Sequence, residues 1–484
     1  MSAAPGYSVV DEIANGNPVM LRGEGELIQK PGQEGLPDKA GHVQFKLRYA
    51  PMGGDIPHAQ AIEMGFQALD EAGASILRWK PASGTRPPLP RYELTGMVEL
   101  DGEGLPIRVD TIFVDYVVGS LPFVMTHTAN EVLVGESLRS EMVRARALVP
   151  NLLAPSVETS ARGLQVNLES ILPGAQQISR DPKYARKILQ THLLHLERPE
   201  STDEALAAHW PDIGEAVEAL GWFLGFYAGR AVHPSVWEGE TEGGPVWCIR
   251  AGVVDPFPSS TITTCLRHDS LDSLEPFLTR AWESWLLLGA QRQRRVRGVV
   301  NAYRQMLTAA FATQRVALVA IYLERLRELV VGGSELLPVT ETFTKSQLQK
   351  VESELRGGLR EAIDSSTKLD EDQKKKLKQS LASNPGKIRD MLRKSFKDSL
   401  LELYDRAGLF VDSSVLNDFI RQRDSIIHGI WDASLEGSMQ TSYWAEYGLS
   451  LLERLVLRFF RYEGLYWDRV TEDIQHFEHR EPTW

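Results

Sequence analysis

The chain has 484 residues, of which 43% are hydrophobic, and its formal net charge is −12. This length predicts two to four domains with substantial cores, and the acidic balance argues against a protein coated in nucleic acid, although a local basic groove is still compatible with it. The longest apolar runs are too short to cross a membrane, the N-terminus lacks a leader pattern, and two cysteines give no disulfide framework, so we expect a cytoplasmic protein without membrane partners.

Residues 1–40 are rich in Gly, Pro and polar side chains, and we expect this segment to be loosely ordered. The region 41–272 is mainly β in pattern. Stretches such as HVQFKLRYA, RYELTGMVEL and ARGLQVNLES alternate polar and apolar residues between turn-forming residues, which is typical of strands with one buried face. The sequence therefore predicts a β-rich domain built as an antiparallel sandwich or a strongly curved antiparallel sheet.

Within this domain, residues 183–230 change period and predict helices. The stretches DPKYARKILQTHLLHLE and DIGEAVEALGWFLGFYAGRAV have helical spacing, and each starts with an Asp that can cap a helix. His192 and His195 would lie three residues apart on such a helix, a spacing that can bind metal. No Cys or carboxylate pattern accompanies them, so we predict no metal site.

The region 273–484 predicts an all-α domain, which makes the fold class α+β. Its amphipathic runs are separated by breaks such as VGGSELLP, SNPG and RAGLFVDSS. Each break contains the Gly, Pro or Asp residues that end helices or cap new ones. The predicted helices cover about 274–306, 309–332, 343–363, 370–382, 386–407, 413–428 and 441–463.

The helix over LNDFIRQRDSIIHGIWD (416–432) carries the main functional signal. At about 100° per residue, Leu416, Phe419, Ile420 and Ile427 share an apolar sector with Arg423 in its middle. An arginine there is costly unless its guanidinium is paired or reaches a polar cleft. Asp412 or Ser413 can cap the start of this helix, and Gly429 suits its end.

Arg423 is followed five residues later by His428. Histidine exchanges protons near neutral pH, and the planar guanidinium of arginine matches a phosphate group. The pair would suit phosphodiester cleavage, with His428 as general base or acid and Arg423 neutralising the phosphate. An ion pair of Arg423 with a carboxylate inside the bundle would explain the same arginine without any catalysis.

The stretch IRQRDSIIHG resembles the R-x4-6-H signature of HEPN domains, in the form found in ApeA-like members. The resemblance covers roughly residues 285–470, and the N-terminal part is more loosely similar to the domain that accompanies such modules. It implies a metal-independent ribonuclease without a cofactor. Two protomers would form one composite cleft, as a homodimer or a higher even oligomer, and the products would be a 2′,3′-cyclic phosphate and a 5′-hydroxyl.

Carried over residue by residue, the resemblance assigns catalysis to Arg423, Asp424 and His428. Glu324, in IYLERL, matches the acidic residue of an early family helix and would either orient Arg423 or His428 or form an ordinary salt bridge. Asp424 departs from the Asn that is most common in active members. Its anion would repel a phosphate unless a cation such as Arg423 offsets it, or it would orient His428 and raise its pKa.

Arg421 lies seven residues before His428, a spacing that the signature also allows. It would be a second phosphate ligand or an exposed arginine. We favour Arg423 as the motif arginine because RDSIIHG is the closer match.

Two basic clusters could bind RNA. One contains Arg292 and Arg295, and the other contains Lys374 and Lys375. Phosphate contacts by these side chains would follow from counterion release, but a solvated helix face is the more usual explanation of such clusters. No phosphate-binding glycine loop is present, and we expect no cofactor.

Three hypotheses follow. The first is an endoribonuclease of anti-phage abortive infection that cleaves host RNA, with tRNA as a target, while the N-terminal domain senses a phage or nucleotide trigger. The second is a catalytically inactive HEPN module for nucleotide binding or dimerisation. The third is a scaffold in which Arg423 is a core ion pair.

Overall fold

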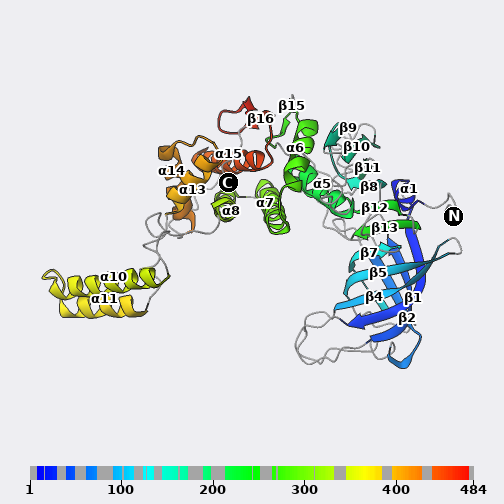
Figure 1. Ribbon diagram of the computed structural model, residues 1–484, viewed down its shortest axis with the longest axis horizontal. Coiled ribbons are helices and arrows are strands. Elements are labelled where there is room, and N and C mark those ends of the chain that lie inside the picture. The colour runs from blue at the N-terminus through cyan, green and yellow to red at the C-terminus, as the bar shows by residue number, and fades with distance from the viewer. Residues whose placement is uncertain are drawn as a thin grey trace. The chain divides into compact units, whose positions relative to one another are not determined.

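The computed structural model (Figure 1) describes most of the chain in segments. The described residues are 8–15, 17–29, 40–49, 62–72, 91–100, 103–113, 124–126, 128–135, 144–161, 164–172, 189–197, 213–241, 244–250, 264–268, 271–309, 311–331, 345–383, 395–427 and 439–478. The chain divides into two compact units. The first comprises Met1–Ala309 and Phe459–His479, and the second comprises Ala310–Arg458 and Arg480–Trp484.

The first unit is organised around one antiparallel sheet of 13 strands in the order β6-β3-β2-β1-β4-β5-β7-β13-β12-β8-β11-β10-β9. Every neighbouring pair in this order is antiparallel. The strands are β1 (Val19–Gln29), β2 (Ala40–Tyr49), β3 (Ile62–Ala68), β4 (Arg91–Leu100), β5 (Glu103–Phe113), β6 (Val124–Thr126), β7 (Thr128–Val134), β8 (Arg144–Pro150), β9 (Val157–Ala161), β10 (Leu164–Ser170), β11 (Gln190–Glu197), β12 (Val236–Thr241) and β13 (Gly244–Arg250).

The sheet is strongly curved, and one of its faces encloses a core. On β2 the buried residues alternate, so that Val43, Phe45 and Leu47 all point to the same side. Strand β3 contacts β7 although β2, β1, β4 and β5 lie between them in the pairing order, which the sheet can achieve only by bending round. Gly25 and Gly96 are direct partners across β1 and β4, and a Cβ on Gly25 would lie 2.5 Å from the carbonyl oxygen of Thr95. Glycine therefore permits the close approach of these strands.

Strand β11 corrects the first part of the helical segment predicted over 183–230, whereas the second part forms a helix as predicted, α5 (Ile213–Ala228). Residues 190–197 pair with β8 on one side and β10 on the other, so this Leu-rich stretch is a central strand. Successive side chains on a strand point to opposite faces, and residues three apart do so as well. His192 is fully buried, its Nε2–H donates to the carbonyl of Ala154 at 3.0 Å, and burial lowers its pKa to about 4. It therefore cannot share a metal with the half-exposed His195.

The predicted domain boundary after residue 272 is wrong, because two further helices belong to the first unit. In this unit α5 (Ile213–Ala228) packs against α6 (Leu274–Leu286) and α7 (Ala290–Thr308), and α6 also contacts β9. The predicted single run 274–306 is divided by a break before α7, where Gly289 takes the N-cap position. The remaining elements of the unit are α1 (Val9–Ala14), β14 (Arg267–His268), β15 (Leu271–Asp272), β16 (Gly464–Asp468) and β17 (Asp473–Phe477).

The chain returns to the first unit after its last helix. The ring of Phe460 lies 5.3 Å from that of Phe223 and 5.6 Å from that of Phe277, centroid to centroid, and Tyr462 lies 6.2 Å from Phe277. The backbone N–H of Trp467 on β16 donates to the carbonyl of Cys265 at 2.7 Å. Residues 459–478 therefore complete a core made by α5 and α6, although the sequence predicts helix up to residue 463.

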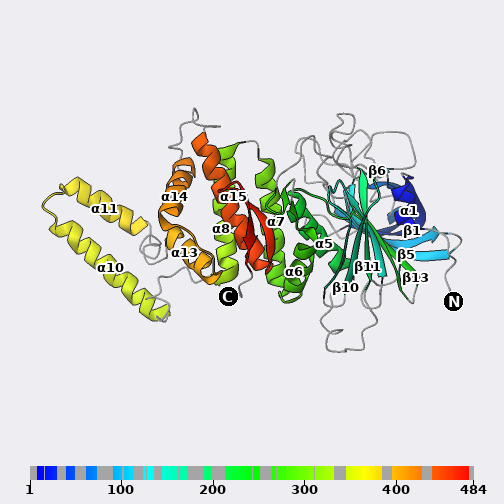
Figure 2. The same cartoon turned by 90° about the horizontal axis from the view of Figure 1, so that it is seen from above.

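The second unit is helical, as predicted. Helix α8 contacts α13 and α14, and α10 pairs with α11 in a hairpin (Figure 2). The buried side chains of this unit include Leu400, Leu403, Leu416, Phe419 and Leu452. The helices are α8 (Ala312–Val331), α10 (Lys345–Ser365), α11 (Glu371–Ser383), α13 (Phe396–Arg406), α14 (Ser413–Ile427) and α15 (Met439–Phe459).

Candidate functional site

Helix α14 forms as the sequence predicts. Asp412 caps it, since one carboxylate oxygen accepts the backbone N–H of Ser414 at 2.7 Å and that of Val415 at 3.3 Å. The hydroxyl of Ser414 and these N–H groups lower the pKa of Asp412 because they stabilise its charged form. The apolar residues Leu416 and Phe419 are fully buried, so one face of the helix is fixed against its neighbours.

Helices α14 and α15 approach each other closely at Gly448. A Cβ at this position would lie 2.9 Å from Cε2 of Phe419 and 3.1 Å from Cγ1 of Val319, so the missing side chain makes room for both α14 and α8. The ring of Phe419 also lies 5.8 Å from that of Tyr447. These contacts fix the position of α14 one turn before Arg423.

Arg423 occupies a half-buried position at the next turn. Its side chain is 22% exposed, and its guanidinium carbon lies 5.0 Å from the centre of the Phe396 ring at the start of α13. One terminal nitrogen donates to Oδ1 of Asp424 at 2.7 Å. The Nε–H is buried and has no acceptor among the residues that the structure describes. The Arg423 guanidinium is thus desolvated on the side that faces the Phe396 ring, and an aromatic face attracts a cation.

Asp424 is the described partner of Arg423, and it comes from the same helix. The carboxylate is 46% exposed, so this pair lies at the edge of the packed helices and is not enclosed between two of them. The sequence leaves two roles open for Asp424, an anion whose charge Arg423 offsets or a group that orients His428. The contact with Arg423 matches the first role.

Arg421 lies on a different face of α14. Its side chain is 76% exposed and lies 3.6 Å from Asp418, which is itself exposed. A pair of this kind contributes little in water. The two arginines of the motif therefore differ in environment, and Arg423 is the one that the fold surrounds.

Two of the predicted site residues fall where no contacts are described. His428 lies outside the described residues. Glu324 falls on α8, but its side chain is not among those that the structure describes. The predicted meeting of Arg423, His428 and Glu324 stays a prediction.

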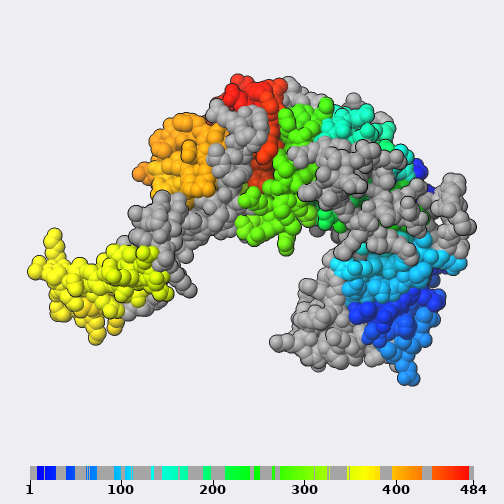
Figure 3. Space-filling model, viewed as in Figure 1, coloured from blue at the N-terminus to red at the C-terminus, as the bar shows by residue number. Residues whose placement is uncertain are grey.

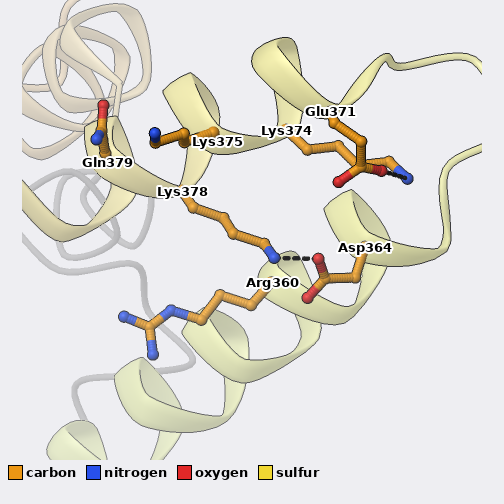
Figure 4. A pocket seen from close by; sticks show the side chains of 7 residues that line it. All are labelled: Arg360, Asp364, Glu371, Lys374, Lys375, Lys378 and Gln379. Atoms are coloured by element: carbon orange, nitrogen blue, oxygen red, sulfur yellow. Dashed lines mark hydrogen bonds and ion pairs between the residues drawn. The ribbon is translucent and has the colours of Figure 1, made fainter.

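The two basic clusters fall on different units. Arg292 and Arg295 are exposed on α7 of the first unit, whereas Lys374 and Lys375 lie on α11 of the second. Lys375 and Lys374 line a groove of about 540 Å³ between α10 and α11 (Figure 4). The full lining consists of Arg360, Asp364, Glu371, Lys374, Lys375, Lys378 and Gln379.

Two of the cations in this groove are neutralised locally. Lys378 pairs with Asp364, and Lys374 lies 3.1 Å from Glu371. Figure 4 shows the Arg360 guanidinium directed away from Asp364, and in the described part of the chain neither Arg360 nor Lys375 forms an ion pair. The groove therefore offers two cations to an anionic ligand.

Comparison with protein-family models, curated proteins and solved structures found no match to this chain.

Metal-binding, disulfide and membrane-spanning features are absent from the described residues. No group of three or more His, Cys, Asp or Glu side chains there is arranged to hold a metal ion. Cys248 and Cys265 are buried and form no disulfide. None of the helices in this part of the chain is both long and apolar enough to cross a membrane.

Phe396 is the residue of this site that the sequence does not reveal. It contacts Arg423 from another helix, and an aromatic residue at the start of an amphipathic helix is ordinary core material by pattern alone. A contact between positions so far apart in the chain depends on how α13 and α14 pack, which neither helix encodes by itself.

Proposed function

We propose that this chain is a metal-independent endoribonuclease of the HEPN type, in which Arg423 and His428 act on the scissile phosphate. The observation that supports it best is the state of Arg423, a half-buried guanidinium over Phe396 whose Nε–H donor has no acceptor among the described residues. Such a group costs free energy in the resting protein, and a phosphate oxygen would supply the missing acceptor. In this proposal the HEPN bundle consists of α8, α13, α14 and α15.

The reaction balances without a metal or a cofactor. The 2′-oxygen of a ribose attacks the adjacent phosphorus, His428 removes the 2′ proton as general base, and the bond from phosphorus to the 5′-oxygen breaks. The leaving 5′-oxygen takes up a proton from water and becomes a 5′-hydroxyl, the other fragment ends in a 2′,3′-cyclic phosphate, and His428 then returns its proton to the solvent. Arg423 stabilises the charge that builds up on the phosphate oxygens.

The cleft would be shared by two protomers that place their α14 helices side by side. The groove between α10 and α11, with Arg360 and Lys375, would add electrostatic contacts to the RNA backbone. In this proposal the enzyme is an anti-phage effector that cleaves host RNA, with tRNA as a candidate target, and the sheet unit responds to the trigger.

A second candidate rests on the bond from Arg423 to Asp424. A carboxylate beside the motif arginine competes with phosphate, which favours a HEPN module that binds nucleotides or dimerises without cleaving RNA. The two candidates differ in their response to Asp424→Asn. In an endoribonuclease this change frees Arg423 and should increase cleavage several-fold, whereas an inactive module should stay inactive.

The test is cleavage of total RNA and of tRNA by the purified full chain in the presence of EDTA. We expect fragments whose 5′ ends accept phosphate from polynucleotide kinase directly, because they carry a free hydroxyl. Overexpression of the wild type should be toxic, and Arg423→Gln and His428→Ala should each relieve the toxicity while circular dichroism shows an unchanged fold. A wild type that is harmless in cells and inert on RNA in vitro would exclude the ribonuclease.

A further inference from the structure

The α10–α11 hairpin has two sides of different chemistry. At about 100° per residue, Arg360 and Asp364 lie on the side of α10 that lines the charged groove of Figure 4. Val351, Leu355 and Leu359 are centred about 140–180° away from them on the same helix. Helix α10 therefore turns the charged groove to one side of the hairpin and an apolar stripe to the other.

Helix α11 repeats this division. Lys375 and Lys378 line the charged groove, and Leu377 projects about 100–160° away from them. The half-buried Ile363 of α10 and Leu381 of α11 fall between these directions on their own helices, so the leucines of both helices emerge on the same side. We call this side the apolar hairpin face. Its described residues are Val351, Leu355, Gly358, Leu359 and Leu377.

The apolar hairpin face is open to solvent. Leu355, Leu359 and Leu377 are 43%, 38% and 44% exposed. A Cβ on Gly358 would meet nothing within 4 Å, so the backbone of α10 is accessible there. Leucines exposed together on one face of an amphipathic helix mark a surface for protein contact. A groove of about 430 Å³ follows this face of α10, and it is lined by Val351, Glu354, Leu355, Gly358 and Leu359.

The size of this face suits a second helical hairpin. Helix α10 has 21 residues and α11 has 13, so the helices are about 30 and 20 Å long and together about 20 Å wide. Two such faces in contact would bury roughly 1,000 Å², which is near the lower limit for a specific interface. Four helices around one apolar centre form a bundle, and this arrangement supplies the core that two helices alone lack.

Two charges at the borders of the face favour a second copy of the same hairpin. Glu361 lies on the side of α10 that points away from α11, about 160° from Ile363, and Lys376 lies on the far side of α11, about 140° from Leu381. Glu361 comes four residues before the end of α10 and Lys376 five residues after the start of α11, so the two stand at the same height. Both side chains are exposed, and neither forms an ion pair among the described residues. At this height one border is negative and the other is positive, so the face complements itself.

We propose that the apolar hairpin face binds the same face of a second copy of this chain, in a four-helix bundle whose twofold axis runs parallel to the helices. Rotation about this axis places α10 of one copy over α11 of the other, and it brings Glu361 of each copy opposite Lys376 of the partner subunit. The charged grooves of both hairpins stay on the outside of the bundle. This contact is separate from the α14 contact of the proposed ribonuclease and does not rest on that function.

Sedimentation velocity of the full-length protein over a concentration series tests the interface. We expect reversible self-association with a dissociation constant on the order of 10 µM, because the face is small. Replacing Leu355 and Leu359 together by Gln should weaken this association at least about tenfold, since the bundle would bury both leucines. Leu287→Gln, at a leucine that is 51% exposed on the first unit, is the matched control and should leave the association unchanged.

A charge exchange tests the orientation of the two copies. Glu361→Lys should weaken the association several-fold, because two lysines then face each other at both borders of the interface. Lys376→Glu should have the same effect, and the double variant Glu361→Lys/Lys376→Glu should restore the association of the wild type. These substitutions leave the leucines in place, so they test the interface even where the leucine variant fails to fold.

Three outcomes would overturn the proposal. The first is a wild type that associates no more strongly than the leucine double variant. The second is a leucine variant with a lower melting temperature and unchanged association, which would assign the face to another segment of the same chain. The third is a double charge variant that associates no better than the single variants. None of these measurements involves RNA cleavage, so a failure of this interface and a failure of the proposed function are distinguishable.

Discussion

The packed helices α8, α13, α14 and α15 and the α10–α11 hairpin belong to the same unit, but they are stabilised in different ways. Around α14 the side chains of Leu400, Leu416 and Phe419 are fully buried. In the hairpin none of the described side chains is buried, and Leu355 and Leu377 are 43% and 44% exposed. The space-filling view shows the hairpin side chains at the surface (Figure 3).

Local interactions hold the hairpin together. Asp370 and Gln373 form a reciprocal capping box at the start of α11, in which each side chain accepts the backbone N–H of the other residue, at 2.7 and 3.1 Å. Lys378 and Asp364 then join the two helices. Charged residues are the normal content of such a surface, so a single lysine there carries little information. In the packed helices a charge must be accounted for, which is why Arg423 is the more informative cation.

The largest expected effect comes from removing the two motif residues. His428→Ala should lower RNA cleavage by roughly 10²- to 10⁴-fold, the usual range for loss of a general acid or base, and Arg423→Gln should lower it by roughly 10²-fold or more. Rates on a labelled tRNA substrate measure both. Arg421→Gln, on the exposed face of the same helix, should change the rate by only a few-fold, and an equal loss there would contradict the distinction between the two arginines.

The hairpin should contribute binding and not chemistry. Replacing Arg360 and Lys375 together by Gln should weaken RNA binding by roughly tenfold and reduce the salt dependence of binding by about one to two contacts. Fluorescence anisotropy at several salt concentrations gives both values. Lys350→Gln is the matched control, because this exposed lysine lies on α10 outside the groove and pairs with Glu354. An unchanged salt slope in the double variant would remove the hairpin from the RNA path.

Replacing glycine by alanine should change the free energy of unfolding in opposite directions in the packed helices and in the hairpin. Gly448→Ala should lower the free energy of unfolding by about 1–3 kcal/mol, since its Cβ would collide with Phe419 and Val319. Gly357→Ala on α10 meets nothing within 4 Å and should stabilise the hairpin by about 0.5–1 kcal/mol, because alanine restricts the unfolded chain. Urea unfolding measures the first, and amide hydrogen exchange over 345–383 the second. Destabilisation at both positions would mean that the hairpin is packed like the other helices.

The smallest effect concerns the cap of α14. The folded-state pKa of Asp412 is lowered, so its contribution to stability is present above the ordinary Asp value and is lost as the pH falls through the lowered pKa. Below that pH the wild type should approach Asp412→Ala in thermal stability, whereas at pH 7 the variant should melt at a lower temperature. A constant difference between the two proteins from pH 7 to about pH 2, below the ordinary Asp range, would show that the charge of the cap is irrelevant.

The sequence predicts helices such as α14 well because their signals are local. Asp412 and the spacing of Leu416 and Phe419 define a capped, amphipathic helix without reference to any other segment. The failures have the opposite character. Residues 190–197 become β11 because β8 and β10 lie on either side. Helices α6 and α7 join the first unit because Phe277 of α6 packs on Phe223 of α5 and Tyr303 of α7 packs on Phe226 of α5. Each of these outcomes depends on partners distant in the chain.

The candidate site also has some features that the local sequence predicts and others that it does not. The type and position of Arg423 follow from the helical pattern, and its partial burial follows from its place in the apolar stripe. Its contact with Phe396 does not follow from any local pattern, since it requires two elements to meet at a particular place.

The return of the chain to the first unit has a consequence for truncated forms of this protein. Residues 310–458 are topologically an insertion, tethered at both ends to the sheet unit. The segment that follows them supplies Phe460 and Tyr462 to the core beside α5 and α6, and the backbone N–H of Trp467 donates to the carbonyl of Cys265. A chain shortened from the C-terminus to residue 458 would keep nearly every helical residue of the second unit but would open the aromatic core of the first. Such a C-terminal truncation would therefore destabilise the first unit, which begins at the N-terminus, more than the helical second unit.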